Sequence, residues 1–394
     1  MTRAARSIAY VLPGRDLVPG DGYTRRLLGL ARALAAHAEV TVVFHRVRAP
    51  FVGEPFEVRA LEPGPAAQSA PEVVPSRRSV GRFVEEHGAR FGVVLEGSWA
   101  SPGRLTAWCA QRGIPAIPVI DRLPSAGWLA PLDAGPAWLG LAASGRYLRR
   151  APVVIAGSEA LRQAMVGRWR VDQGRIAVIG PGVDRARLFP ADQAAARRTL
   201  GLSPEHRILV AGGALDRRHD LTPLIEAVLR AGDPALRLHV LGAGERRAGL
   251  ERVAAADPAV RFHGRVPDGL VATWIAAADL CVAVEDPTGP LYEDGVETTF
   301  AVRECQAAGR PVAVGSVGGA GRPFLRHGVT GFLVEHDLVD WIRFLQRDCP
   351  SRNVLRDMGQ AAAALPVEGL DRTAAAYLEA IERAVRAGAA PAVR

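Results

Sequence analysis

Residues 207–231 read RILVAGGALDRRHDLTPLIEAVLRA, and this stretch decides the fold class. A mostly apolar run at 207–211 ends at a Gly-Gly pair, and a segment at 221–231 follows with its apolar residues at helical spacing. Apolar residues that do not alternate with polar ones predict a strand buried on both faces, and such strands occur in parallel sheets covered by helices. The stretch therefore predicts one strand–loop–helix unit of an α/β fold.

The same unit recurs along the whole 394-residue chain. Further helical spacing occurs at 24–36 and 298–309. We expect two Rossmann-like domains at 1–190 and 200–370, an irregular linker near 183–203, and a last helix at 371–388 that packs back on the first domain. The apolar runs that predict strands lie at 8–12, 40–44, 92–95, 116–120, 152–156 and 175–179 in the first series, and at 207–211, 237–241, 260–263, 280–284, 311–314 and 331–334 in the second.

The basic residues exclude several classes of protein. All 49 are arginine, so a Walker P-loop and a pyridoxal-phosphate Schiff base, which both need lysine, are excluded. The arginines are scattered among acidic residues, so the net charge of +8 does not indicate a nucleic-acid partner. The arginine, alanine, glycine and proline bias is typical of a bacterium with GC-rich codons. The four cysteines lack paired spacing, which favours buried thiols over disulfides or a zinc site.

Two features of the chain concern its location. No apolar run approaches the ~20 residues that a membrane-spanning helix needs. The basic start, MTRAARSIAYVLPG, has an apolar stretch of five residues that ends at Pro13-Gly14, which is too short for a signal peptide. We therefore expect a cytoplasmic protein.

Glycine-rich loops follow several of the predicted strands. They are Gly212-Gly213, Gly242-Ala-Gly244 and Gly318-Gly319. Ligands of open parallel sheets bind at the carboxyl ends of the strands, and glycine lets the backbone approach a phosphate there. A single pair is more typical of a tight turn between strand and helix, but three in one half favour a phosphate-bearing ligand.

Several motifs together resemble the retaining glycosyltransferases of family 4, which have the GT-B fold. The resemblance covers nearly the whole chain in order and is strongest from 152 to 336. The motifs that carry it are VETTFAVRECQAAGRPVAVGSVGG at 296–319, IGPGVD at 179–184 followed by Phe189-Pro190, AGSE at 156–159, FHGRVP at 262–267, ADL at 278–280 and GVTG at 328–331.

The resemblance implies a division of labour between the domains. The C-terminal domain holds a nucleotide sugar, the N-terminal domain holds the acceptor, and no metal or further cofactor is needed. Glu304 accepts hydrogen bonds from the ribose hydroxyls, as a carboxylate can. The remaining residues implied for the donor are Gly213, Arg265, Val266, Pro267, Thr299, Gly318 and Gly319, and those implied for the sugar and acceptor are Gly20, Gly22 and Tyr23.

The chain departs from the family pattern in its charged residues. The family's earlier glutamate falls on Val296, and Glu297 beside it is either a catalytic substitute or an ordinary loop acid. The family's arginine and lysine for the diphosphate fall on Ala214 and His219. Arg217 and Arg218 either supply the missing positive charge or form a surface pair.

The family's N-terminal histidine is replaced by Asp121, which either acts on the sugar or acceptor as a catalytic residue or caps the next segment. Glu96 and Ser98 are further cleft-facing candidates for acceptor binding. The apolar stretch 123–148 fits core packing, an acceptor pocket or a peripheral membrane contact.

Two functions from different classes fit these observations. The first is a retaining, metal-independent transfer of a sugar from a nucleoside diphosphate to a hydroxyl or amine of a small-molecule or lipid-linked acceptor. The second is a GT-B protein that has lost its chemistry and serves as a binding or partner subunit. A nicotinamide dehydrogenase is third, because the sequence after Gly242-Ala-Gly244 lacks the third glycine of a dinucleotide fingerprint.

Overall fold

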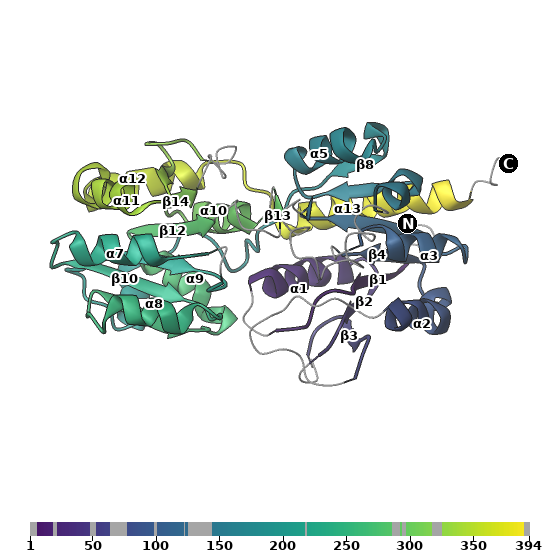
Figure 1. The fold of residues 1–394 in the computed structure, drawn as a ribbon, viewed down its shortest axis with the longest axis horizontal. Coiled ribbons are helices and arrows are strands. Elements are labelled where there is room, and N and C mark those ends of the chain that lie inside the picture. Colours follow the sequence, from purple (N-terminus) through teal and green to yellow (C-terminus); the bar gives the residue numbers. More distant parts are fainter. Residues whose placement is uncertain are drawn as a thin grey trace, which may run out of the picture.

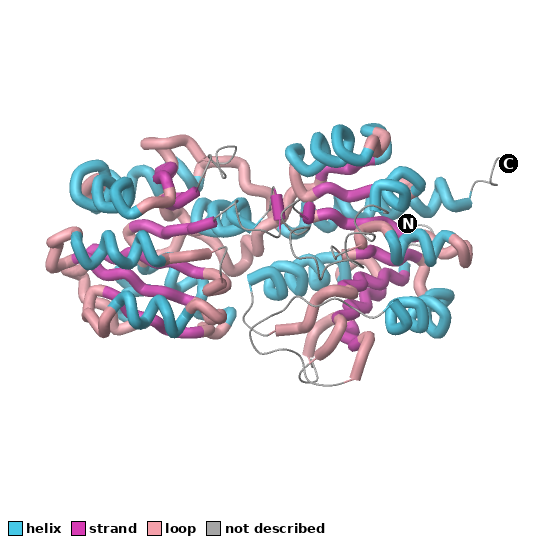
Figure 2. The backbone as a smooth tube through the Cα atoms, viewed as in Figure 1, coloured by secondary structure: helices cyan, strands magenta, loops and turns pink. Residues whose placement is uncertain are grey.

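The described part of the chain forms two lobes, each built on a parallel sheet with helices against it (Figures 1 and 2). The computed structural model describes residues 6–18, 22–47, 53–63, 77–97, 101–121, 123–124, 144–216, 219–285, 292–293, 297–316 and 325–389. This architecture confirms the α/β fold class.

The first lobe contains a seven-stranded sheet in the order β3-β2-β1-β4-β5-β7-β8 among the described residues. Its strands pair in parallel throughout. The strands are β1 (Ser7–Leu12), β2 (Glu39–Phe44), β3 (Glu57–Ala60), β4 (Val93–Glu96), β5 (Ala116–Ile120), β7 (Val154–Ala156) and β8 (Ile176–Val178), and the helices are α1 (Gly22–Ala35), α2 (Arg77–His87), η2 (Gly88–Arg90), α3 (Arg104–Ala110), α5 (Glu159–Trp169) and η5 (Gln173–Arg175).

The second lobe contains a six-stranded parallel sheet in the order β11-β10-β9-β12-β14-β15 within the described ranges. The strands are β9 (Arg207–Gly212), β10 (Leu236–Leu241), β11 (Val260–Gly264), β12 (Leu280–Glu285), β14 (Val312–Ser316) and β15 (Gly331–Glu335). The helices are α6 (Gln193–Thr199), α7 (Thr222–Arg230), α8 (Arg247–Ala254), α9 (Asp268–Ala277), α10 (Glu297–Ala307), α11 (Leu338–Arg343), the π-helix η7 (Phe344–Asp348) and α12 (Arg352–Ala363).

The strands are buried because helices cover both faces of each sheet. In β1, Ile8 to Leu12 are all at most 3% exposed. The edge strand β3 was not predicted: its sequence EVRA is charged at two of four positions, and the strand is half-buried to exposed. The predicted strand positions in the second lobe agree with the observed ones to within one or two residues.

The chain passes between the lobes at two points that lie side by side. Val183 and Gly369 form a parallel bridge, with the Val183 amide donating to the Glu368 carbonyl at 2.9 Å. A short antiparallel pair of β6 (Leu123–Pro124) and β13 (Tyr292–Glu293) joins the two lobes as well. These pairings hold the carboxyl edges of the two sheets near each other.

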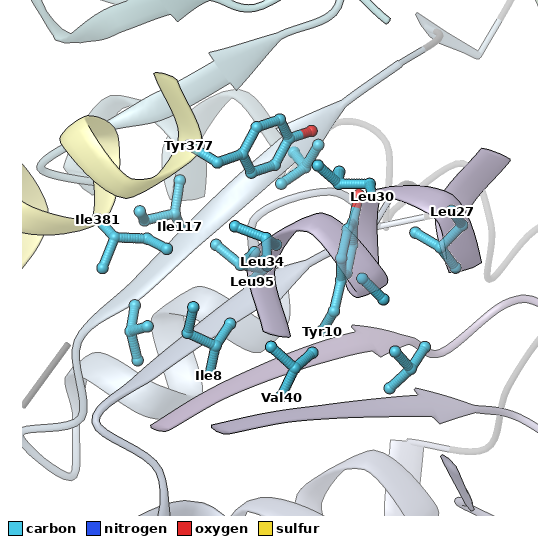
Figure 3. Packing of buried hydrophobic residues seen from close by; sticks show 14 of the residues in the cluster. Ile8, Tyr10, Leu27, Leu30, Leu34, Val40, Leu95, Ile117, Tyr377 and Ile381 are labelled. Atoms are coloured by element: carbon cyan, nitrogen blue, oxygen red, sulfur yellow. The ribbon is translucent and has the colours of Figure 1, made fainter. Parts of the chain in front are cut away.

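The last helix, α13 (Leu370–Ala389), packs on the first lobe although it follows the second in the chain. Figure 3 shows Tyr377 and Ile381 of α13 facing Ile117 and the α1 side chain Leu34. Ile381 is fully buried in this cluster. The helix therefore contributes to the core of the first lobe.

Candidate functional site

The carboxyl ends of the strands in the second lobe form one wall of a pocket, and the first turns of α1 form the opposite wall. Gly212 at the end of β9 and Gly213 and Ala214 after it lie on the first wall, with Gly242 and Ala243 after β10. From α1 come Gly22, Arg25 and Arg26. This cleft pocket lies where an open parallel sheet binds its ligands.

The glycines of the two loops allow backbone to pack directly on backbone. A Cβ atom at Gly242 would collide with the carbonyl oxygen of Gly213, and Gly242 has a φ of +134°. The Gly213 amide donates to the Leu241 carbonyl at 3.1 Å, and the Leu215 amide donates to the Ala243 carbonyl at 3.1 Å. The result is a pocket floor of main chain that a phosphate can approach closely.

Glu304 lines the pocket from α10 and is 7% exposed. Its carboxylate accepts two hydrogen bonds from Nη2 of Arg25 in the first lobe, at 3.0 Å to Oε2 and 3.2 Å to Oε1. Glu304, predicted to bind the ribose, therefore lies in the cleft pocket and pairs with Arg25 on the opposite wall. Arg25 was missed by the sequence reasoning, although it lies on α1 close to the predicted residues Gly22 and Tyr23.

The cleft pocket also has apolar lining residues. Arg265 and Val266, from the FHGRVP motif, line it together with Ile275 of α9 and two thiols. Contact with the Cys281 thiol and burial raise the pKa of the Cys305 thiol well above its ordinary value, so Cys305 stays neutral. Pro267, which the family resemblance also implies for the donor, precedes α9 as its N-cap.

A second cavity lies at the carboxyl edge of the first sheet and shares Arg26 with the cleft pocket. Asp121, which directly follows β5, lines it with Tyr23. The Arg15 guanidinium lies 3.8 Å from the centre of the Tyr23 ring. Burial and the neighbouring Tyr377 raise the pKa of the Tyr10 hydroxyl, which also lines this cavity. Helix α13 therefore brings a residue from the end of the chain to this site.

The sequence reasoning missed Tyr10, Thr373 and Tyr377 as lining residues. Tyr10 lies inside a strand, and the other two lie on a helix about 250 residues after Asp121, so no local pattern marks them.

Two predicted site residues have other partners. Glu96 was expected to face the cleft and bind the acceptor; instead it is 1% exposed and accepts hydrogen bonds from the Leu105 amide at 3.3 Å and the Thr106 amide at 2.8 Å. That prediction is wrong because the carboxylate stabilises the start of α3. His219 pairs through Nδ1 with Oδ1 of Asp216 at 2.8 Å and is not among the lining residues of the described pocket.

The remaining predictions fall where the structure gives no description. Gly20, Ser98, Arg217, Arg218, Gly318 and Gly319 lie outside the described residues, as does most of 123–148. Helix α10 begins at Glu297 and includes Thr299, but the side chains of these two residues also lie outside the description.

Among the residues that the structure describes, no three His, Cys, Asp or Glu side chains gather where they would hold a metal ion. No helix in that part of the chain combines the length and apolar character that crossing a membrane requires.

Comparison with known proteins adds two family matches. Residues 20–187 match the model of glycosyltransferase family 4, and residues 205–347 match that of glycosyl transferases group 1. The D-inositol 3-phosphate glycosyltransferase of Pseudarthrobacter chlorophenolicus is 32% identical over 61% of this chain, and the alignment spans little more than half (58%) of that relative. The protein of the same name from Streptomyces scabiei is 28% identical over 96% of this chain and 90% of its own length.

Solved structures share the arrangement of the two lobes. HepE of Anabaena in complex with UDP and glucose superposes with a TM-score of 0.70 at 15% identity, over 96% of this chain and 99% of that one. Sucrose-phosphate synthase from Thermosynechococcus elongatus gives a TM-score of 0.67 at 22% identity, over 97% and 98%. At these identities the likeness concerns the fold.

Proposed function

This chain belongs to the family 4 glycosyltransferases of the GT-B fold, and on that premise we propose that it is a retaining, metal-independent enzyme that transfers a sugar from a nucleoside diphosphate to an acceptor hydroxyl or amine. The donor occupies the cleft pocket. The acceptor occupies the second cavity, and the shared residue Arg26 adjoins the place where the two substrates react. A cytoplasmic location stays a prediction.

The position of Glu304 is the observation that carries this proposal. Its carboxylate lines a pocket whose other lining residues include glycine main chain and the apolar side chains of Val266 and Ile275. A nucleoside diphosphate presents matching features: phosphates for the glycine main chain, ribose hydroxyls for Glu304 and a flat base for the apolar side chains. A ribose bound by Glu304 directs its base toward Arg265 and Val266 and its phosphates toward Gly213.

The transfer breaks the bond between the anomeric carbon and the phosphate oxygen, and the electron pair goes to the departing diphosphate. The new bond forms to the acceptor oxygen or nitrogen, whose proton goes to a base. Main-chain N–H groups and arginine side chains at the cleft stabilise the negative charge that develops on the phosphate. Asp121 orients the acceptor group in the second cavity, and Glu297 is the further catalytic candidate.

The acceptor is a small molecule or a lipid-linked sugar. Relatives named for D-inositol 3-phosphate make a phosphorylated cyclitol the first acceptor to assay. Arg26, which lines the second cavity, suits such an anion.

One observation favours the alternative of a catalytically silent partner subunit. Ala214 lines the cleft pocket at the position where family resemblance implies an arginine, and His219, at the lysine position, is engaged by Asp216. This alternative predicts that no sugar nucleotide is consumed by the chain alone. Release of a nucleoside diphosphate from a sugar nucleotide by the purified chain would exclude it.

Thermal melting with UDP, GDP, ADP and dTDP tests the proposed donor class. A ligand at one hundred times its Kd stabilises the folded chain by about 2.7 kcal/mol. We expect one of the four to raise Tm in the wild type and to have a much smaller effect on a Glu304→Ala variant. A wild-type chain that none of the four stabilises would overturn the proposal.

A further inference from the structure

Arg25 reaches from one lobe to the other across the cleft pocket. It lies on α1 of the first lobe, and Glu304 lies on α10 of the second, 279 residues later in the chain. Both side chains are largely withdrawn from solvent, with 17% of Arg25 and 10% of Glu304 exposed. The pair therefore holds the atoms that a ribose would otherwise contact.

The pocket contains more positive than negative charge. Among its described lining residues the cations are Arg25, Arg26 and Arg265, and Glu304 is the carboxylate. Arg265 comes from the second lobe, and Ala214 leaves the loop after β9 without a charged side chain at that position. A diphosphate bound against this part of the loop needs a cation, because two phosphates in a partly buried site are stabilised poorly without one, and Arg25 is a described arginine on the opposite wall.

We propose that Arg25 is a ligand shared between Glu304 and the donor. In the empty cleft its guanidinium pairs with Glu304; when the ribose hydroxyls take Glu304, it turns to the diphosphate attached to the same ribose. The planar fork of arginine binds carboxylate and phosphate in the same geometry, and a diphosphate carries more negative charge than one carboxylate, so the exchange favours the bound donor. The first lobe thus supplies a phosphate-binding charge that the second lobe lacks at residue 214.

This inference rests on the proposed nucleotide-sugar function and adds that Arg25 affects the binding of a nucleoside and of its diphosphate differently. A nucleoside without phosphates must separate Arg25 from Glu304 and offers the arginine no new partner. A nucleoside diphosphate offers one. The exchange therefore predicts that Arg25 strengthens the binding of the diphosphate but opposes the binding of the nucleoside.

Calorimetric titration of an Arg25→Gln variant tests this asymmetry. The ligands are UDP, GDP, ADP and dTDP, each beside its own nucleoside. We expect the variant to bind the preferred diphosphate at least about tenfold more weakly than the wild type, because a hydrogen bond to a charged group contributes enough free energy for such a change. We expect the variant to bind the nucleoside as well as the wild type does, or better. Arg112→Gln is the matched control, because it removes an arginine of the same lobe whose partner Glu85 is mostly exposed.

Two outcomes would overturn the inference, and they are distinguishable. If Arg25→Gln alters diphosphate and nucleoside binding by the same factor, Arg25 only links the two lobes and does not bind the phosphates. In that case the proposed function stands. If the wild type binds none of the diphosphates, both proposals fall. An Arg25→Lys variant, which keeps the charge and loses the fork, should give an intermediate preference for the diphosphate; it keeps the test decisive if the glutamine variant fails to fold.

Discussion

Replacing Arg197 by methionine should destabilise the second lobe strongly. Arg197 on α6 is 3% exposed, and its Nη2 donates to Oδ2 of Asp279 at 2.7 Å. The same carboxylate accepts from the Ile208 amide at 2.7 Å and, through Oδ1, from Nε of Arg352 at 3.2 Å. Without Arg197, the buried Asp279 carboxylate keeps only part of the hydrogen bonding and positive charge that offset its removal from water.

Breaking a buried ion pair by removing one partner costs about 3–5 kcal/mol. At about 2–4 °C per kcal/mol for a domain of this size, Tm should fall by roughly 6–20 °C. Urea unfolding followed by circular dichroism gives the free energy, and thermal melting gives Tm. Arg352→Met is the control, since it removes an arginine from the same carboxylate but from a side chain that is 38% exposed, where about 0–1 kcal/mol is expected. Equal losses in the two variants would refute the reasoning from burial.

Three further predictions concern the packing of the fold and the pH dependence of its stability. Ile381→Ala should cost about 2–5 kcal/mol in urea unfolding, because it empties a fully buried position between α13 and the first sheet; a change below about 1 kcal/mol would contradict that placement of α13. Gly182→Ala should lower Tm, since the added Cβ would collide with Oγ1 of Thr373, whereas Gly167→Ala, where a Cβ meets nothing, should not. Burial and the neighbouring His263 lower the pKa of His239 to about 4, so between this value and about 6.5 the unfolded chain binds a proton that the native state does not. The free energy of unfolding should therefore fall as the pH drops from about 6.5 to about 4. In a His239→Phe variant the urea midpoint should fall less steeply over the same pH range.

The sequence predicted the sheets better than the site. Strands such as β9 and β12 are continuous apolar runs, and burial on both faces leaves that pattern plainly in the residues. The ADL motif at 278–280 also has a local physical reason in the structure, because Asp279 pairs with Arg197 and with a strand amide. An edge strand such as β3 has no such burial and so leaves no such pattern.

The site depends on contacts that no local pattern contains. Arg25 and Glu304 meet only because the two lobes face each other, and Tyr377 reaches the second cavity only because α13 returns to the first lobe. Glu96 illustrates the opposite error. A carboxylate at the end of a strand resembles a ligand in the sequence, but the helix that follows uses it internally.

The most direct test of the account is the recognition of ribose by Glu304. Calorimetry should compare the stabilising nucleoside diphosphate with its 2′,3′-dideoxy counterpart on the wild type, on Glu304→Ala and on the control Glu226→Ala, which removes a surface carboxylate paired with Arg230. The account predicts that the wild type and the control prefer the hydroxylated form by about tenfold or more and that Glu304→Ala loses this preference. An equal preference in all three proteins would contradict the assignment of the cleft pocket to a nucleotide-sugar donor.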